Sequence, residues 1–365
     1  MALRPECVHF RGDKPCSGKL PCESCADFAA FPPRILIIKC RAQGDVLRTT
    51  PLLPALKRKH PRSFISWLVD PESLPLLAGN PLVDRLYAFD LEGCLSLQGE
   101  IYDAVISLDK EPGPTALAAA VRAPRKYGFG MSEHGQLTVF NAASDYAYRL
   151  GVDDELKFRD NRKTYQEIIH MAAELPYAGD EYVFALPQGA REKPARFFRR
   201  HRIPAGKLAI GLNTGAGAKF ATKQWPAESY VRLASLLARR LQADVFLLGG
   251  PRERDLNLAI ARRVRARIHD TGTDNTLPDF AGFLDRMDIV VSSDTLGMHI
   301  AIALKKKVVG LFGPTCPQEI DLYGRGVKLF AGADCAPCFK SACPDLKCMK
   351  AITPDLVFDE VRKLL

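Results

Sequence analysis

The stretch "RILIIKCRAQGDVLRTTPLLPALKRKH", residues 34–60, decides the fold of this chain. It opens on an apolar run rich in isoleucine, which is typical of a buried strand. The run stops, the pair Gly44-Asp45 follows, and a Thr, Pro and Leu stretch predicts a helix. Pro51 and Pro54 fit poorly in a helix interior, so we expect an irregular helix start that leaves Asp45 in a loop.

The same alternation of short strands and helical segments continues along most of the chain. Candidate strands of the first part lie at 34–39, 63–70, 83–90 and 102–109, and those of the second part at 207–215, 243–250, 287–294 and 307–315. This pattern predicts an α/β fold with two doubly wound halves of parallel sheet joined by helical crossovers. Because ligands bind beyond the carboxyl ends of such strands, we expect the two halves to face a central cleft.

Composition divides the chain into four segments. Residues 1–31 form a Cys-rich extension with little periodicity, and a stretch rich in Pro and charge separates two α/β domains at 32–188 and 189–350. Residues 351–365 form an amphipathic C-terminal helix, which begins with Thr353 as N-cap and Pro354 as its first residue.

Asp45 follows the first strand on the cleft side, and two roles are open for it. Its carboxylate can cap the following helix by accepting hydrogen bonds from backbone N–H groups. It can also point into the cleft and act as a catalytic base. Gly44 permits the turn in either case, and these residues taken alone favour the cap.

Three loops that follow strands of the second half are candidate phosphate or nucleotide sites. Neither the G-x-G-x-x-G fingerprint nor a P-loop occurs: "GAGAKF" (215–220) lacks the third glycine. The candidate donors of the first loop, 213–226, are Thr214, Gly215 and Lys223, with an ordinary polar loop as the alternative. In the second loop, 249–255, Glu253 can accept hydrogen bonds from ribose hydroxyls. The alternative is that Glu253 is an acidic residue at the start of a helix, where the helix dipole favours it.

The third loop, 292–303, places Asp294 and Thr295 where a strand meets a helix N-terminus, with His299 about one turn later. Small polar side chains at a helix N-terminus suit an anion. The alternative is that Asp294 is an N-cap and His299 is structural.

Composition and charge limit the class of protein. Hydrophobic residues make up 47% of the chain and charged residues 25%, as in globular proteins. No apolar run approaches the roughly 18 residues of a membrane span, and no signal peptide is visible, so we expect a cytoplasmic protein. The net charge of +9 favours an anionic partner: nucleic acid, an anionic membrane surface or a phosphorylated substrate. The basic clusters match no nucleic-acid module, so we expect no nucleic-acid partner.

Eight of the eleven cysteines fall into two groups of four. The first group is Cys7, Cys16, Cys22 and Cys25, and the second is Cys335, Cys338, Cys343 and Cys348. Without a secretory signal, such spacing favours metal over disulfides. The first group predicts a structural zinc site with His9 as a competing ligand, and the second a zinc or iron–sulfur site. Free thiols in irregular loops are the alternative.

Taken together, these segments resemble glycosyltransferase family 9, the lipopolysaccharide heptosyltransferases. The similarity covers about residues 34–365 and is carried by the series "ILIIKCRAQGDVLRTTPLLPALKRKHP", "NTGAGAKFATKQWP", "FLLGGPRERD", "SSDTLGMHIAIAL" and "VVGLFGPTCP". The Cys-bearing tail resembles one found in second-heptose transferases. The resemblance implies the GT-B architecture, two Rossmann-like domains with the active site between them.

The resemblance also implies a function. A heptose would pass from an ADP-heptose donor, bound by the second domain, to a lipid-linked anionic acceptor of the lipopolysaccharide inner core, bound by the first. The transfer would invert the anomeric centre and need no metal or other cofactor, and the enzyme would contact the inner face of the inner membrane.

The family's site residues map onto positions of this chain. Asp45 is the implied general base and Lys223, with Thr214 and Gly215, the implied binder of the departing diphosphate. Glu253 falls near the ribose, and Asp294, Thr295 and His299 near the diphosphate. In two places the chain departs from the family: Leu296 replaces the usual glycine, which follows one place later as Gly297, and the loop between Thr214 and Lys223 is longer.

Two other functions remain open. The first keeps the GT-B architecture with another nucleotide-sugar donor or with epimerase chemistry. The second is a metal-binding or redox protein built around the two cysteine groups.

Overall fold

The apolar runs of the first half become one sheet in the computed structural model, which describes residues 3–16, 21–217 and 220–365. Residues 1–2 and 17–20 of the expected extension, and 218–219 of the expected phosphate loop, lie outside the described residues. The strands of this sheet are β1 (Arg34–Ile38), β2 (Phe64–Val69), β3 (Arg85–Ala88), β4 (Ala104–Ser107), β5 (Lys126–Met131) and β6 (Leu137–Val139). Their spatial order is β3-β2-β1-β4-β5-β6, and only the pairing of β5 with β6 is antiparallel among those described.

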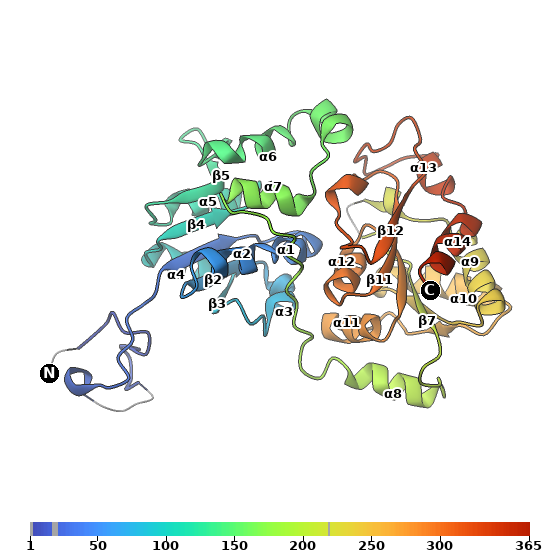
Figure 1. Cartoon of the computed structure of the whole chain (residues 1–365), viewed down its shortest axis with the longest axis horizontal. Coiled ribbons are helices and arrows are strands. Elements are labelled where there is room, and N and C mark those ends of the chain that lie inside the picture. Colours follow the sequence, from blue (N-terminus) through green and yellow to red (C-terminus); the bar gives the residue numbers. More distant parts are fainter. Residues whose placement is uncertain (1–2, 17–20, 218–219) are drawn as a thin grey trace.

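The second half repeats this topology. Its strands are β7 (Ala209–Asn213), β8 (Asp244–Leu248), β9 (His269–Asp270), β10 (Ile289–Ser293), β11 (Lys307–Phe312) and β12 (Gly326–Phe330). They pair in parallel in the order β12-β11-β10-β7-β8-β9. If β7 is counted as the first strand and the sheet is read from the β9 edge, this order is the same as in the first sheet. The expected α/β fold with two doubly wound, Rossmann-like halves is therefore confirmed, and the halves lie side by side (Figure 1).

Helices connect the strands and cover the sheets. Those of the first half are α1 (Gln43–Thr49), α2 (Leu52–Lys59), α3 (Leu74–Leu77), α4 (Leu91–Gly99), α5 (Pro112–Ala120), α6 (Asp145–Arg149) and α7 (Tyr165–Ala172). The later ones are α8 (Glu192–Arg200), α9 (Ala227–Arg240), α10 (Arg254–Arg263), α11 (Leu277–Asp285), α12 (Leu296–Ala303), α13 (Lys347–Lys350) and α14 (Pro354–Lys363). Among the described residues, no helix is long and apolar enough to cross a membrane.

Short helical turns join these elements. They are η1 (Cys22–Ser24), η2 (Pro71–Ser73), η3 (Ala142–Ser144), η4 (Leu156–Asp160), η5 (Ala221–Lys223), η6 (Pro251–Glu253) and η7 (Pro317–Glu319). The turn η4 is a single turn of π-helix, and the others are 3-10 turns.

The helix after β1 corrects one expectation. It begins at Gln43, so Asp45 lies in its first turn and not in a loop. The irregularity falls after Asp45, where Thr50 and Pro51 separate α1 from α2. Pro54 is tolerated because it lies in the first turn of α2, where backbone N–H groups have no partner within the helix.

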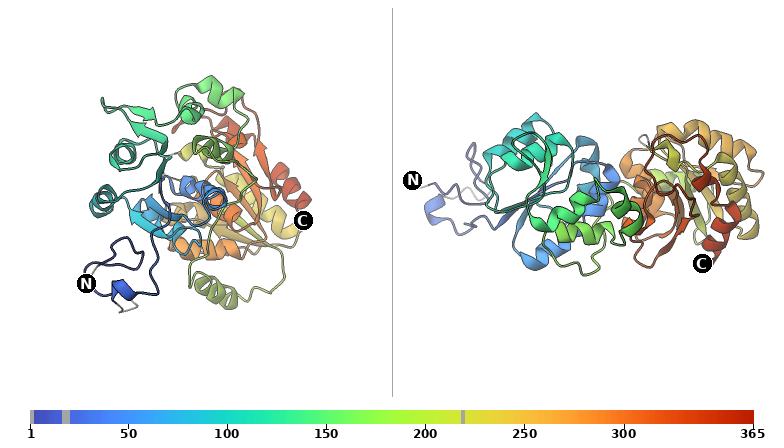
Figure 2. Two further views of the ribbon diagram at one scale, coloured as in Figure 1. Left: turned by 60° about the vertical axis from the view of Figure 1, so that its left-hand side comes forward. Right: turned by 90° about the horizontal axis from the view of Figure 1, so that it is seen from above.

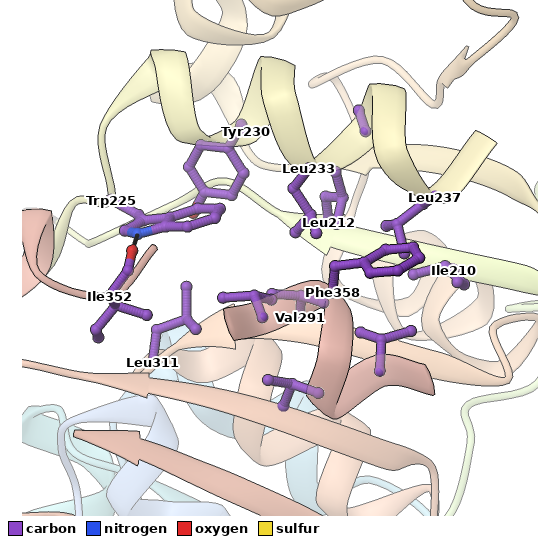
Figure 3. Packing of buried hydrophobic residues seen from close by; sticks show 14 of the residues in the cluster. Ile210, Leu212, Trp225, Tyr230, Leu233, Leu237, Val291, Leu311, Ile352 and Phe358 are labelled. Atoms are coloured by element: carbon purple, nitrogen blue, oxygen red, sulfur yellow. Dashed lines mark hydrogen bonds between the residues drawn. The ribbon is translucent and has the colours of Figure 1, made fainter. Parts of the chain in front are cut away.

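The core of the second half joins α9, the sheet and the C-terminal helix (Figure 3). Trp225 and Phe358 lie in this core, the former fully buried, and the indole N–H of Trp225 donates to the backbone carbonyl of Ile352 at 2.9 Å. The last residues of the chain thereby support the loop that precedes α9.

A second apolar cluster crosses between the halves. Leu47 of α1 and Leu76 of α3 belong to the same buried cluster as Ile300 of α12. The Cys-rich extension, by contrast, lies at the end of the first half that is remote from the second (Figure 2).

Candidate active site

The carboxyl ends of β1 and β4 mark the point where strand order reverses in the first sheet, and β7 and β10 mark it in the second. Ligands of doubly wound sheets bind at such points. Helices α1 and α12, which follow β1 and β10, contact each other between the halves (Figure 1). Residues just after these four strands are therefore the first candidates for an active site.

Cationic side chains hold the Asp45 carboxylate. Its Oδ1 lies 2.9 Å from Nε of Arg48, and its Oδ2 lies 3.9 Å from Nζ of Lys39. The backbone N–H of Ala42 donates a long hydrogen bond, 3.4 Å, to Oδ2. Burial alone would raise the pKa of this carboxyl. The charges of Arg48, Lys39 and His299 outweigh burial and lower the pKa to about 2.

The structure therefore gives less support to the capping role of Asp45 than to a role of its carboxylate in the site. Its capping bond is at the limit of hydrogen-bond length, whereas its contact with Arg48 is short. A third of the side chain remains exposed, at 33%. An ionised and accessible carboxylate suits a proton acceptor, and the role of base stays a prediction.

Lys39 and Asp109 form a buried ion pair at the switch point of the first sheet. Nζ of Lys39 lies 2.6 Å from Oδ1 of Asp109, and both side chains are almost inaccessible. The carboxylate also accepts a hydrogen bond from the backbone N–H of Cys40. Burial would lower the pKa of Lys39, but Asp109 raises it overall, so Lys39 stays charged beside Asp45.

On the other side, Asp294 holds Lys223 and His299 together. Nζ of Lys223 donates to the backbone carbonyl of Asp294 at 2.9 Å and lies 3.1 Å from its Oδ2. Oδ1 of Asp294 lies 3.6 Å from Nε2 of His299, whose Nδ1 lies 3.1 Å from the Tyr182 hydroxyl. Burial would raise the pKa of Asp294, but Lys223 and His299 hold it well below its usual range.

Gly44 brings these two groups of charges into contact. A Cβ atom on Gly44 would lie 2.6 Å from Cδ2 of His299. The glycine is therefore needed for the close approach of α1 to α12. Asp45 lies beside this contact on the first half, and Asp294 lies beside it on the second.

Arg48 crosses from α1 to the second half. Its guanidinium carbon lies 3.8 Å from the centroid of the Tyr165 ring, and its Nη1 lies 3.8 Å from Oε2 of Glu319 in η7. Burial raises the pKa of Glu319 above its usual range, although Arg48 counteracts it. Arg48 thus lies between two carboxylates, one from each half.

The other expected binding residues make their contacts within the second half. The Thr214 hydroxyl lies 3.0 Å from the carbonyl oxygen of Leu248 and 2.6 Å from Oδ1 of Asn257, and its backbone N–H donates to Leu248 as well. The polar groups of Thr214 are therefore used within the second half, and its contact with a phosphate stays a prediction. The Glu253 carboxylate lies against Gly215, where a Cβ atom would be 3.2 Å from its Cδ.

Thr295 is the residue before α12, and its side chain makes no capping bond to this helix in the described structure. Its Oγ1 instead accepts a hydrogen bond, 2.9 Å, from Nδ2 of Asn213. Leu296 is the first residue of α12, and a Cβ atom on Gly297 would lie 2.6 Å from Nδ2 of Asn213. The displaced glycine therefore lets α12 pack against the end of β7.

The two cysteine groups lie apart from these residues. Cys7, Cys16, Cys22 and Cys25 line one cavity of about 840 Å³ in the extension, together with His9. In the second group, the backbone N–H of Leu346 donates to Sγ of Cys343 at 3.4 Å, while Cys335 and Cys338 add to burial in raising the pKa of Cys348.

The thiols of both groups carry the expectation of a metal site. All eleven are unpaired in the described part of the chain. Among the described residues, no three Cys, His, Asp or Glu side chains lie close enough to hold a metal ion. Zinc or iron–sulfur binding stays a prediction.

Sequence reasoning missed the cations and carboxylates that surround Asp45. Lys39 directly follows β1, Asp109 lies two residues after β4, and Arg48 lies one helical turn after Asp45, so each carried a local signal. Glu319 and Tyr165 carried none. The packing of the two halves brings Glu319 to Arg48, and the packing of α7 against α1 brings Tyr165 to it.

Two doubly wound domains with acidic and basic residues at their facing switch points are typical of two-domain nucleotide-sugar enzymes. Residues 94–349 match the sequence model of glycosyltransferase family 9 (heptosyltransferase), and the chain belongs to this family.

Individual relatives are more distant. A lipooligosaccharide heptosyltransferase 2 of Campylobacter jejuni is 28% identical over 165 residues, 44% of this chain and 52% of the relative. The lipopolysaccharide core heptosyltransferase OpsX of Haemophilus influenzae is 23% identical over 304 residues, 78% of this chain and 80% of the relative. The chain thus spans about half the length of the first relative and most of the second.

The chain also shares its fold with solved structures. The Escherichia coli ADP-heptose lps heptosyltransferase II superposes with a TM-score of 0.65 at 17% identity, over 91% of this chain and 98% of that one. This likeness confirms the expected GT-B arrangement.

Proposed function

We propose that this protein transfers a heptose from ADP-heptose to the inner core of lipopolysaccharide, with inversion of the anomeric carbon. Family membership and the names of the relatives support the chemistry. The observation that carries the proposal is the Gly44–His299 contact, because it places Asp45 and the Lys223–Asp294 pair on opposite sides of one interface.

In the proposed reaction, the acceptor binds the first half and the donor binds the second. Asp45 takes the proton of the attacking acceptor hydroxyl while its oxygen forms a bond to the anomeric carbon. The bond from that carbon to the diphosphate oxygen breaks on the opposite face, and ADP leaves.

Lys223 and the free N–H groups at the start of α12 stabilise the charge that develops on the diphosphate. Asp294 orients Lys223 and His299, Thr295 shapes the start of α12, and Thr214 and Gly215 form the loop around the phosphates. Glu253 accepts hydrogen bonds from the ribose. No metal or other cofactor enters this reaction.

Because the pKa of Asp45 is low, the proposed reaction needs a further step that makes this carboxylate more basic. A general base works best when its pKa lies near the working pH, and the contact with Arg48 makes Asp45 a weak base. Glu319 lies 3.8 Å from Arg48 and offers it a second partner. We propose that the acceptor hydroxyl displaces Arg48 toward Glu319, which raises the basicity of Asp45 at the moment of attack.

The test of the proposed reaction is the Asp45→Asn variant. We expect it to abolish transfer from ADP-heptose to truncated lipopolysaccharide acceptors and to leave ADP binding unchanged, because the proposed reaction assigns Asp45 to the acceptor and not to the donor. The control is Asp355→Asn, which loses an exposed pair with Arg232 and keeps full activity. Wild-type turnover in Asp45→Asn would remove Asp45 as the base.

The donor requires a separate test. Binding raises the melting temperature of a protein, so a panel of nucleotide sugars in a thermal-shift assay ranks the donors. We expect ADP-heptose to give the largest shift. A larger shift with a uridine nucleotide would favour a GT-B enzyme with another donor.

We further propose a cytoplasmic enzyme, peripheral on the inner face of the inner membrane, where its lipid-linked anionic acceptor lies. The net charge of +9 supports such a partner, and nucleic acid is not part of the proposal. Flotation with anionic vesicles tests the membrane contact. If the protein remains in the dense fraction, the proposal of a membrane contact is wrong.

For the cysteine groups we retain structural zinc or an iron–sulfur cluster as a proposal, supported by their spacing and by the Leu346–Cys343 contact. A role in catalysis is not proposed. Elemental analysis of purified protein should find near-stoichiometric zinc or iron, and a lack of both would leave ordinary thiols.

A further inference from the structure

The cysteine-bearing tail, residues 335–352, holds the turn that carries Lys223 from both sides. The hydroxyl of Thr222, the residue before Lys223, donates to the backbone carbonyl of Lys340 at 2.7 Å. Two residues after Lys223, the indole N–H of Trp225 donates to the carbonyl of Ile352 at 2.9 Å (Figure 3). The tail is itself fixed to the second half, because the N–H groups of Cys338 and Phe339 both donate to the carbonyl of Pro314 after β11.

The same tail reaches the first half through Phe339. Its ring stacks on Phe158 of η4, with centroids 5.8 Å apart and planes at 16°. Nζ of Lys157 lies 4.0 Å from the centroid of the Phe339 ring. The same ring also meets the loop that carries Lys223, where Phe220 packs edge-on against Phe339 with ring centroids 6.0 Å apart. Phe339 therefore touches both the first half and the loop that carries Lys223.

A fixed Lys223 has a clear energetic advantage. A lysine side chain has many rotamers, and a three-residue turn such as η5 has no strand ladder to hold it. A group that must meet a diphosphate in one geometry binds more tightly when its surroundings hold it there beforehand. The tail supplies such support around Lys223.

We propose that the tail is a positioning segment for the donor site, which holds Lys223 ready for the diphosphate and links the Lys223 turn to the contact between the two halves. This inference rests on the proposed function, because it takes Lys223 as the diphosphate ligand. It gives the tail a role in substrate affinity in addition to any role in stability.

The test removes the link without removing the ligand. In Thr222→Val the side chain keeps its shape but loses the hydroxyl that donates to Lys340. We expect the KM for ADP-heptose and the Kd for ADP to rise about 3- to 10-fold, the loss typical of one hydrogen bond, with kcat nearly unchanged. Thr222→Ser keeps the hydroxyl and should restore wild-type values. Thr276→Val is the control, because Thr276 caps α11 away from this loop and affects only stability.

A variant in the other half tests the link through Phe339. Phe158→Leu should also raise the donor KM, although Phe158 belongs to the first half. Phe31→Leu removes one ring of an edge-on aromatic pair with Phe64 and should leave the donor KM unchanged. This pair keeps the proposal testable if Thr222→Val does not fold.

The outcomes separate the two proposals. If Lys223→Ala loses ADP affinity while Thr222→Val and Phe158→Leu keep it, the tail is structural only and the inference is wrong. If Lys223→Ala keeps ADP affinity, the proposed donor site itself is wrong.

Discussion

Asp45 shows how a residue's neighbours set its chemistry. The carboxylate faces two cations from its own half, Lys39 and Arg48, and its pKa falls to about 2 in consequence. A capping aspartate would instead direct its oxygens at the helix N–H groups, and here that bond is long. At the residue scale, the charge of Arg48 is the main cause of the low pKa of Asp45.

Replacing Arg48 should therefore move the pH dependence of the reaction. Asp45 must be ionised to accept a proton, so activity is present above its pKa and is lost as the pH falls through it. In Arg48→Gln the pKa rises toward the ordinary value of about 4, and the acid limb of kcat/KM moves to higher pH. A pH–rate profile beside that of Arg232→Gln, an exposed arginine, measures the shift. An unmoved acid limb in Arg48→Gln would show that Arg48 does not tune Asp45.

At the scale of elements, the approach of α1 to α12 depends on a glycine. A side chain at Gly44 would overlap the imidazole of His299, so the two helices could not keep their spacing. The apolar cluster that joins Leu47 to Ile300 depends on the same spacing. The pair of helices thus determines both the joint core and the position of Asp45.

Gly44→Ala should separate these helices. We expect a loss of about 1–3 kcal/mol in the free energy of unfolding, as in overpacked cores, together with a reduced kcat. Gly99→Ala is the matched control, since Gly99 ends helix α4 and a Cβ atom there meets nothing within 4 Å. Denaturant unfolding of both variants provides the comparison, and equal stability of the two would show that α12 yields to the extra methyl group.

The elements differ in how visible they are in the sequence. Strands β1, β2, β7, β8, β10 and β11 are buried along most of their length, and their apolar runs predicted them. Strand β5, with two glycines, the two-residue β9 and the half-exposed β12 were not predicted, because none has a long apolar run.

At the scale of the whole molecule, the net charge of +9 should matter more for the acceptor than for the donor. Long-range attraction weakens as the Debye length falls from about 10 Å in about 0.1 M salt to about 3 Å in about 1 M salt. We therefore expect the KM for the anionic lipopolysaccharide acceptor to rise steeply over this range.

Because kcat reports the bound complex, it should change little with salt. Steady-state kinetics in a salt series, with each substrate varied in turn, measures both constants. A KM for the acceptor that does not depend on salt would show that the net charge does not contribute to acceptor recognition.

The sequence by itself determined the two α/β halves and the family. It also determined which candidate site residues follow strands: Asp45, Lys223, Glu253, Asp294 and His299. These are local properties, because the period of apolar residues and the residues after each strand are read within a few positions. The tertiary structure alone decided that Asp45 lies inside a helix, that Arg48 lies between carboxylates of both halves, and that the tail surrounds the Lys223 turn. The contacts of Arg48 and of the tail join residues up to hundreds of positions apart. The packing of one half against the other creates the contact of Arg48 with Glu319, and folding within the second half creates those of the tail with the Lys223 turn.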